Sequence, residues 1–278
     1  MRAGSVTLSR PPPLSTQGDS LDRYLVPDAT CRLRVSGWDQ ERTSASPWCG
    51  VAPVTRTVGG TDDGPEADRM QYLVTMTTQV PDGVSEEEVD DVRSREAARS
   101  RELAAGGHLL RLWRPPLQPG EWRTLGLFAA DDADRLEEVL ASMPLRIWRH
   151  DDVIALAPHP NDPPSPPAHR PGAREFLTTF ALTVPDDVGP QAVDEAQAAE
   201  SRSARELADQ GYLVHLWTLP GRGRALGLWQ ADSGGEFQAI LAALPLGPWL
   251  EIETVSLSGH PNDPAVTAPA ACRASRAV

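Results

Sequence analysis

The sequence predicts an α+β protein built from two tandem copies of one βαββαβ domain. Three observations support this prediction: motifs that recur at a constant spacing, hydrophobic periodicities that change between strand-like and helix-like, and Gly or Pro at the expected ends of elements. The chain has 278 residues with 27 prolines and 22 glycines, so two small domains with long connecting segments fit its length and composition.

The repeat is visible as motifs in the same order in both halves. QYLVTMTTQVP at residues 71–81 matches EFLTTFALTVP at residues 175–185, and E-x-x-x-x-R-E-L-A-x-x-G begins at Glu96 and again at Glu200, each pair 104 residues apart. Beyond the loop at residues 115–123 the spacing falls to 101, so the first copy has three extra residues there. Both copies end in HPNDP. A single gap in a loop, with motifs intact on either side, indicates a duplication.

Each copy predicts the same order of elements. Alternating apolar residues predict an opening strand, and a capping box at Ser85–Glu88 and Pro190 predict the starts of helices that Gly107 and Gly211 end. The rest of the first copy predicts two strands, a helix and a final strand, at residues 109–114, 125–129, 132–142 and 147–156. The order is βαββαβ, the ferredoxin-like arrangement.

Helices cover only one face of such a sheet, so something else must bury the other face. Either the two copies pack sheet to sheet, as in a dimeric α/β barrel, or each copy pairs with another chain. We expect the following boundaries: an irregular extension with a candidate strand at 24–35, a first domain, a stiff Pro-rich linker, a second domain and a loose tail, at residues 1–68, 69–157, 158–173, 174–264 and 265–278.

Charge and composition exclude several classes of function. The net charge of −13 argues against nucleic-acid binding, and the chain has no apolar run long enough to span a membrane. The N-terminus lacks an apolar signal stretch, so we expect a cytoplasmic protein. All 26 basic residues are Arg, which excludes lysine chemistry. Cys31, Cys49 and Cys272 are widely separated and are expected to be free thiols.

A carboxylate interrupts the apolar stripe of the first predicted helix in both copies. Glu96 and Glu200 each occupy the middle of a stripe whose members are three or four residues apart. Burial raises the pKa of a Glu, so that it can take up and return a proton near neutral pH. The alternative is a narrow stripe, with each Glu solvated at its edge or paired with an Arg. Arg101 and Arg205 are expected to face solvent.

Other candidates for substrate binding are cationic and aromatic. Arg111 and Trp113 share one face of a predicted strand, as do His215 and Trp217, and a cation beside an aromatic ring suits a carboxylate or an enolate. A Trp in the core with a polar neighbour at its rim is the alternative. Further candidates are two Trp residues near the last strands and the His of each HPNDP turn, which alternatively only ends a strand: Trp148, Trp249, His159 and His260. No metal-ligand spacing and no phosphate-binding motif is present, so we expect neither metal nor cofactor.

Taken in order, these motifs resemble muconolactone isomerase over about 95 residues in each copy, roughly two-thirds of the chain. The likeness rests on the helix motif, the strand ending in Leu-Trp, the Pro-Leu before a Trp and the closing His-Pro. VHLW at residues 214–217 is the nearest local match, because the family typically shows RHLWR. The first copy has Arg111 in place of that His, and the second has Thr218 in place of the following Arg. Two such sites need not be equivalent.

The resemblance implies a ferredoxin-like fold, oligomers with active sites at subunit interfaces, and a cofactor-free proton shift. That shift converts muconolactone to the 3-oxoadipate enol-lactone in aromatic-acid catabolism. The resemblance assigns Glu96 and Glu200 as bases, and it places Arg111 and His215 at the family's His position. The expected partners are a small anionic lactone or organic acid, within a homo-oligomer or an intramolecular pseudo-dimer.

Two other functions also fit the sequence. One is a non-catalytic module that binds a small organic acid or serves assembly, and the other is a cofactor-independent monooxygenase of the dimeric α/β-barrel type. Catalysis requires both Glu side chains to open into a pocket with an Arg or His within hydrogen-bond reach, whereas solvent-facing carboxylates would count against it.

Overall fold

The computed structural model describes residues 69–170 and 172–267. The predicted extension at 1–68, its candidate strand and the three cysteines lie outside these residues. The first repeat consists of β1 (Met70–Thr78), α1 (Glu86–Ala105), β2 (Leu109–Arg114), β3 (Arg123–Ala130), α2 (Ala133–Ala141), a 3-10 helix η2 (Pro144–Trp148) and β4 (Arg149–Pro158). The second consists of β5 (Arg174–Leu182), α3 (Pro190–Asp209), β6 (Leu213–Thr218), β7 (Arg224–Ala231), α4 (Gly234–Ala242), η3 (Gly247–Trp249) and β8 (Leu250–Gly259).

The predicted βαββαβ order is confirmed in both repeats, and local chemistry explains the helix ends. The Ser85 hydroxyl accepts a hydrogen bond from the Glu88 N–H at 3.2 Å, as an N-cap should, and Pro190 occupies the first turn of α3. Gly107 and Gly211 follow the ends of α1 and α3 with φ of 68° and 79°. Other residues rarely adopt this left-handed backbone, so the two glycines end the helices as predicted.

Two boundaries differ from the sequence prediction. The final strand of the first repeat begins at Arg149 rather than at residue 147, because residues 144–148 form the 3-10 turn η2. The tail after residue 264 was expected to be loose, but Pro264–Thr267 forms a short helix, α5. Its first turn is held by Asp263, whose carboxylate accepts a hydrogen bond from the Ala265 N–H at 3.3 Å.

The eight strands form one closed barrel in the order β1-β3-β2-β8-β5-β7-β6-β4. Within each repeat long antiparallel ladders join the strands, and two short antiparallel ladders, β2 with β8 and β4 with β6, join the repeats. Each of the eight strands therefore has a neighbour on both sides, although the two ladders between the repeats pair only two residues of each strand. Of the two ways to bury the open sheet faces, the chain therefore uses its own second copy.

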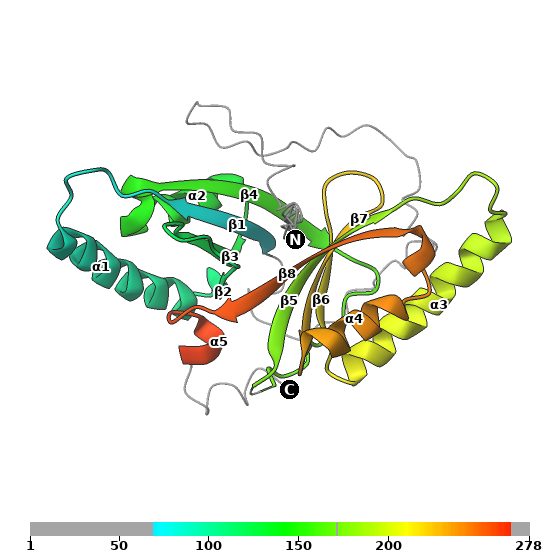
Figure 1. Cartoon of the computed structure of the whole chain (residues 1–278). Coiled ribbons are helices and arrows are strands. Elements are labelled where there is room, and N and C mark those ends of the chain that lie inside the picture. Colours follow the sequence, from blue (N-terminus) through cyan, green and yellow to red (C-terminus); the bar gives the residue numbers. More distant parts are fainter. Residues whose placement is uncertain (1–68, 171, 268–278) are drawn as a thin grey trace, which may run out of the picture. The chain divides into compact units, whose positions relative to one another are not determined.

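Three hydrophobic cores follow from this topology. Within each repeat both helices lie on one face of the four-stranded sheet (Figure 1), and one core fills the space between them. The third core fills the barrel and takes residues from both repeats, among them Trp113 and Trp217. No helix in the described part of the chain is long and apolar enough to cross a membrane.

The two HPNDP turns attach each repeat to the other. The Asp162 carboxylate, at the end of the first repeat, accepts a hydrogen bond from the Leu216 N–H at 2.7 Å. The Asp263 carboxylate, at the end of the second repeat, accepts one from the Leu112 N–H at 3.1 Å. The turn after β4 thus contacts β6, and the turn after β8 contacts β2. Each turn therefore lies toward the helix-covered face of the opposite repeat.

We expect the stability of the protein to depend on pH because of His159, the first residue of the first HPNDP turn. Burial lowers the pKa of His159 to about 4, partly opposed by Asp162. Between pH 6.5 and 4 the unfolded chain therefore binds a proton that the folded chain does not, so the free energy of unfolding falls as the pH falls. We expect this residue to account for up to about 3 kcal/mol of that loss.

Urea denaturation at pH 7 and pH 4.5 of the wild type and of His159→Asn measures this effect. The variant should lose less stability on acidification than the wild type does. Glu96 and Glu200, whose raised pKa values act in the opposite direction, are common to both proteins and cancel in the comparison. An identical loss in both proteins would show that His159 is not responsible.

Candidate active site

Glu96 lies in the middle of the buried face of α1, where the sequence predicts it. Glu96 is 8% exposed, and its carboxylate accepts hydrogen bonds from the Leu145 N–H at 2.9 Å and from Nη1 of Arg149 at 3.2 Å. Burial raises the pKa of Glu96, with a smaller contribution in the same direction from Asp151, and these outweigh the lowering by Leu145 and Arg149. The carboxylate is therefore oriented by two donors and binds a proton more readily than a solvated one.

This carboxylate opens on a cavity of about 370 Å³ between the helices and the sheet of the first repeat. Among the described residues, Glu96 is the one carboxylate in its lining, together with three arginines and residues from both repeats: Met76, Thr78, Arg93, Ser100, Leu112, Arg114, Trp122, Thr124, Met143, Leu145, Arg149, His260, Pro261 and Asn262. The lining is therefore net positive, in a chain whose net charge is −13. Such a cavity suits a small anionic molecule.

The second repeat contributes to this cavity through its closing turn. Burial and the positive charge of Arg114 lower the pKa of His260 to about 4, partly opposed by Asp263, so its ring is neutral at neutral pH. Nδ1 of His260 accepts a hydrogen bond from the Asn262 N–H at 3.1 Å, which leaves Nε2 to carry the ring proton. The turn thus brings a neutral imidazole to a cavity whose carboxylate belongs to the first repeat.

Two arginines of the lining differ in their surroundings. The guanidinium of Arg93 lies over the ring of Trp122, 4.4 Å from its centroid, and Trp122 belongs to the loop that is three residues longer in the first copy. Arg114 forms no ion pair with any other described residue, although its backbone carbonyl accepts a hydrogen bond from the Ser258 hydroxyl. Its charge is available to a ligand.

The equivalent position in the second repeat is almost closed. Glu200 makes the same backbone contact as Glu96, since it accepts a hydrogen bond from the Leu246 N–H at 3.0 Å, and burial raises its pKa. Its cavity is only about 20 Å³. The lining has no Arg or His and is mostly apolar: Asn161, Phe180, Ala204, Leu207, Leu213, Leu216, Ala225, Trp229, Leu244 and Leu250. The requirement for a nearby Arg or His is met at Glu96 and not at Glu200.

The substitutions between the repeats explain this difference. Leu250 stands where the first repeat has Arg149, and Ala204 stands where it has Ser100. Trp229 takes the place of the smaller Phe128 and packs against Phe180 with ring centroids 6.3 Å apart. Apolar side chains, among them the larger Trp229, thus line the second cavity, whereas the first stays open and polar.

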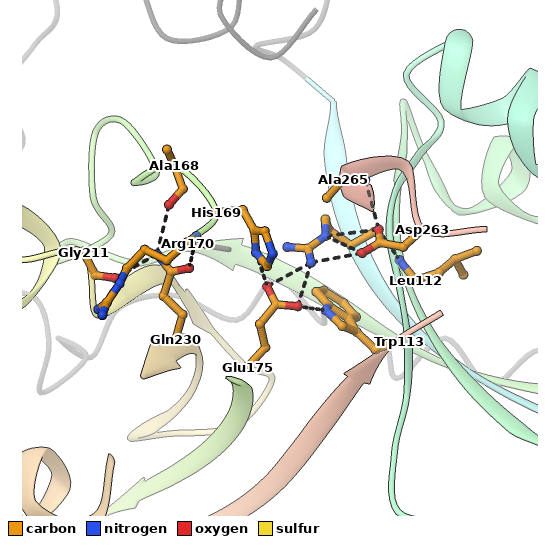
Figure 2. Close-up of polar contacts among 11 residues, drawn as sticks. Leu112, Trp113, Ala168, His169, Arg170, Glu175, Gly211, Gln230, Asp263 and Ala265 are labelled. Atoms are coloured by element: carbon orange, nitrogen blue, oxygen red, sulfur yellow. Dashed lines mark hydrogen bonds and ion pairs between the residues drawn. The ribbon is translucent and has the colours of Figure 1, made fainter. Parts of the chain in front are cut away.

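Arg111 and Trp113 lie away from Glu96, and this corrects their assignment to one site with it. They share one face of β2 as predicted, but that face is the barrel interior. Nη2 of Arg111 lies 2.7 Å from a carboxylate oxygen of Glu175 and 3.1 Å from one of Asp263. Nε1 of Trp113 donates to Glu175 at 2.8 Å (Figure 2). Helix α1 covers the other face of β2, so Leu112 and Arg114 line the cavity instead.

His215 and Trp217 occupy the corresponding place between β6 and the first repeat, and they also lie away from Glu200. Nε1 of Trp217 donates to Gln71 at 2.7 Å, and the ring of His215 stacks on Trp217 with Nδ1 3.3 Å from Asp162. Asp162 and Gln71 are the repeat equivalents of Asp263 and Glu175. The junctions between the repeats are therefore alike in geometry, with a charged network at one and fewer ionised groups at the other.

Of the remaining predicted residues, only His260 lines one of the two cavities. His260 lines the Glu96 cavity, whereas His159 is buried in the turn whose Asn161 lines the closed second cavity. Trp148 and Trp249 are half-buried and line neither cavity. Arg101 and Arg205 are exposed, as expected. Among residues 69–170 and 172–267 no group of three His, Cys, Asp or Glu side chains is placed to hold a metal ion.

Sequence reasoning missed Arg149, the donor to Glu96, and the position of Arg114 in the lining of the cavity. One signal was available for both. Arg149, Asp151 and Arg114 become Leu250, Ile252 and Thr218 in the second copy, a loss of charge concentrated around the cavity of one repeat.

The chain is similar to known proteins in each of its repeats. A sequence model of the family described as muconolactone delta-isomerase matches residues 70–162 and 174–263. Similarity extends to the muconolactone Delta-isomerase of Rhodococcus opacus, 30% identical over 32% of this chain and 95% of that protein, and to that of Acinetobacter baylyi, 28% identical over 31% and 91%. A crystal structure of muconolactone isomerase is 28% identical over 31% of this chain and 91% of its own, with a TM-score of 0.30. The chain belongs to the muconolactone delta-isomerase family, a family of isomerases, and contains its domain twice.

Proposed function

We propose that the protein isomerises a small unsaturated lactone of the muconolactone type, which bears a carboxylate, in the cavity of the first repeat. The observation that carries this proposal is the position of Glu96, a buried carboxylate with a raised pKa that opens on a cavity of about 370 Å³ with three arginines. The names of the relatives support the same reaction. The metabolic role that accompanies this substrate is aromatic-acid catabolism.

The reaction needs one base and no redox partner. Glu96 removes a proton from the ring carbon beyond the C=C bond, and the electron pair of that C–H bond spreads over a dienolate. The protonated Glu96 then returns the proton to the carbon next to the lactone carbonyl, so the C=C bond has moved by one position and the atoms balance. The raised pKa of Glu96 suits this double role, because the same group must first accept and then release the proton.

The substrate's carboxylate is assigned to Arg114. This arginine lines the same cavity, has no acidic partner among the described residues, and is Thr218 in the second repeat. Asn262 and the neutral His260 add hydrogen-bond donors from the opposite repeat. The positive lining also stabilises the negative charge that develops on the dienolate.

The direct test is to incubate the purified chain with muconolactone and follow its depletion and the accompanying change in absorbance. We expect turnover with no added cofactor. Calorimetry with the same compound separates the alternatives if no turnover occurs, because a module that only binds organic acids would still give a binding isotherm. The absence of turnover would contradict the proposed function.

Arg114→Thr, which copies the second repeat, should raise KM about 10- to 100-fold, with a smaller change in kcat. The estimate corresponds to the loss of one charge-assisted hydrogen bond to the substrate. Steady-state kinetics at two salt concentrations provide the check, since an arginine–carboxylate contact weakens with added salt. The exposed Arg101→Thr serves as the control for the loss of one positive charge. An unchanged KM would place the carboxylate elsewhere.

A further inference from the structure

A row of alternating charges extends from Glu96 to the surface of the first repeat. Nη1 of Arg149 contacts Glu96, and its Nε and Nη2 contact the two oxygens of Asp151 at 2.6 and 3.0 Å. Asp151 also accepts a hydrogen bond from Arg146 at 2.7 Å, and Arg146 donates to Glu137 at 2.8 Å. The side chains of Arg149 and Asp151 are 2% and 0% exposed, whereas Arg146 and Glu137 reach solvent.

The second repeat keeps the Glu, as the half-buried Glu200, and lacks this entire row. The positions of Arg149, Asp151, Arg146 and Glu137 hold four uncharged residues: Leu250, Ile252, Gly247 and Gln238. Glu200 nevertheless contacts the backbone of Leu246 as Glu96 contacts that of Leu145. The fold of a repeat therefore does not require the charged row, which is found only where the cavity is open.

The charged row limits how far Arg149 lowers the pKa of Glu96. A lone buried arginine at 3.2 Å from a carboxylate would stabilise its charged form and weaken it as a base. Asp151 contacts Nε and Nη2 of Arg149, the two nitrogens that do not contact Glu96, and its negative charge offsets much of the positive charge of Arg149. Arg149 can then fix the orientation of Glu96 without greatly reducing its affinity for a proton.

The other charged or titratable groups around Glu96 are few. Arg93 lies on the same helix, Arg114 on β2 and His260 on the turn after β8, and all three line the cavity. In the part of the chain that the structure describes, Asp151 is the acidic group whose charge acts on the pKa of Glu96 with the opposite sign to that of Arg149.

We propose that Asp151 is a positioning residue for the isomerase: it holds Arg149 against Glu96 and offsets its charge, so that Glu96 is oriented and still acts as a base. The catalytic meaning of this inference rests on the proposed function. The electrostatic relationship itself is a property of the protein and can be measured without any substrate.

Two variants should move the titration of Glu96 in opposite directions. Asp151→Asn leaves the full charge of Arg149 beside Glu96, so the midpoint should move to lower pH by about one unit. Arg149→Leu with Asp151→Ile copies the second repeat and removes the cation, so the midpoint should move to higher pH. Carboxyl ¹³C NMR follows both, and the resonance that disappears in Glu96→Gln identifies the group.

Asp152→Asn provides the matched control, because Asp152 is the next residue on β4 and contacts the exposed His150 at 3.2 Å. It removes one negative charge from the same strand and should leave the Glu96 midpoint unchanged. In turnover assays Asp151→Asn should lower kcat about three- to tenfold and shift the acidic limb of the pH profile to lower pH.

The outcomes separate the two proposals. If the titrations behave as expected but no lactone is converted, the proposed function fails while the relationship between Asp151 and Glu96 stands. If Asp151→Asn leaves the midpoint of Glu96 unchanged, or moves it no more than Asp152→Asn does, the positioning role of Asp151 is overturned.

Discussion

Glu96→Gln is expected to lower kcat for the lactone by about 10²- to 10⁴-fold, the range associated with the loss of a general acid–base group. The amide can still accept the hydrogen bond from the Leu145 N–H, so the helix should keep its place, but it cannot accept the substrate's proton. Steady-state kinetics give the loss, and circular dichroism with a denaturation curve verifies that the variant is folded.

Glu200→Gln is the matched control, since it makes the same change at the same helical position of the other repeat. Its cavity of about 20 Å³ has no room for a lactone, so kcat should stay within about twofold of the wild type. Equal losses in the two variants would mean that both repeats are active. Full activity in Glu96→Gln would show that Glu96 is not the base.

Arg111→Ala is expected to lower the free energy of unfolding by about 3–5 kcal/mol. Burial lowers the pKa of Arg111, but attraction to Glu175 and Asp263 outweighs this effect and keeps the guanidinium charged. The substitution removes the guanidinium from beside these two carboxylates, whose side chains are 8% and 0% exposed. His169, 3.8 Å from Glu175, is a weaker substitute (Figure 2). Urea denaturation measures the loss.

The opposite junction supplies the control for this experiment. Arg111→His combined with Glu175→Gln reproduces the His215 and Gln71 pair, so it removes the cation together with one of its carboxylates. This double variant should lose clearly less stability than Arg111→Ala, because fewer buried charges remain unpaired. If it loses as much or more, the cost lies in the packing of the arginine rather than in its charge.

The order of elements, the duplication and the position of Glu96 on a buried helix face could all be predicted from the sequence. These features depend on local periodicity and on residues such as Ser85 and Gly107 that act over one turn. The packing of the two sheets against each other remained one of two alternatives. The choice depends on contacts of Asp162 and Asp263 with residues about 54 and 151 positions away.

The assignment of sheet faces shows the limit of such reasoning. Alternation along β2 states that Arg111 and Trp113 share a face, but not whether that face meets the helices or the barrel interior. The bulge between residues 109 and 111 also shifts the register of the strand. For the same reason His215, which brings the second copy nearer to the family's RHLWR motif, lies at a junction between repeats rather than beside Glu200.

The closure of the barrel within a single chain has a consequence for how the two halves can change. In a symmetric dimer each substitution occurs twice, so a residue that improves one pocket alters its twin as well. Here different parts of one chain form the two halves, so each half can change independently. Assembly of the Glu96 pocket is then a first-order process that dilution does not oppose. The second repeat can therefore accept apolar substitutions around Glu200 without any change at Glu96, while its closing turn still lines the Glu96 cavity.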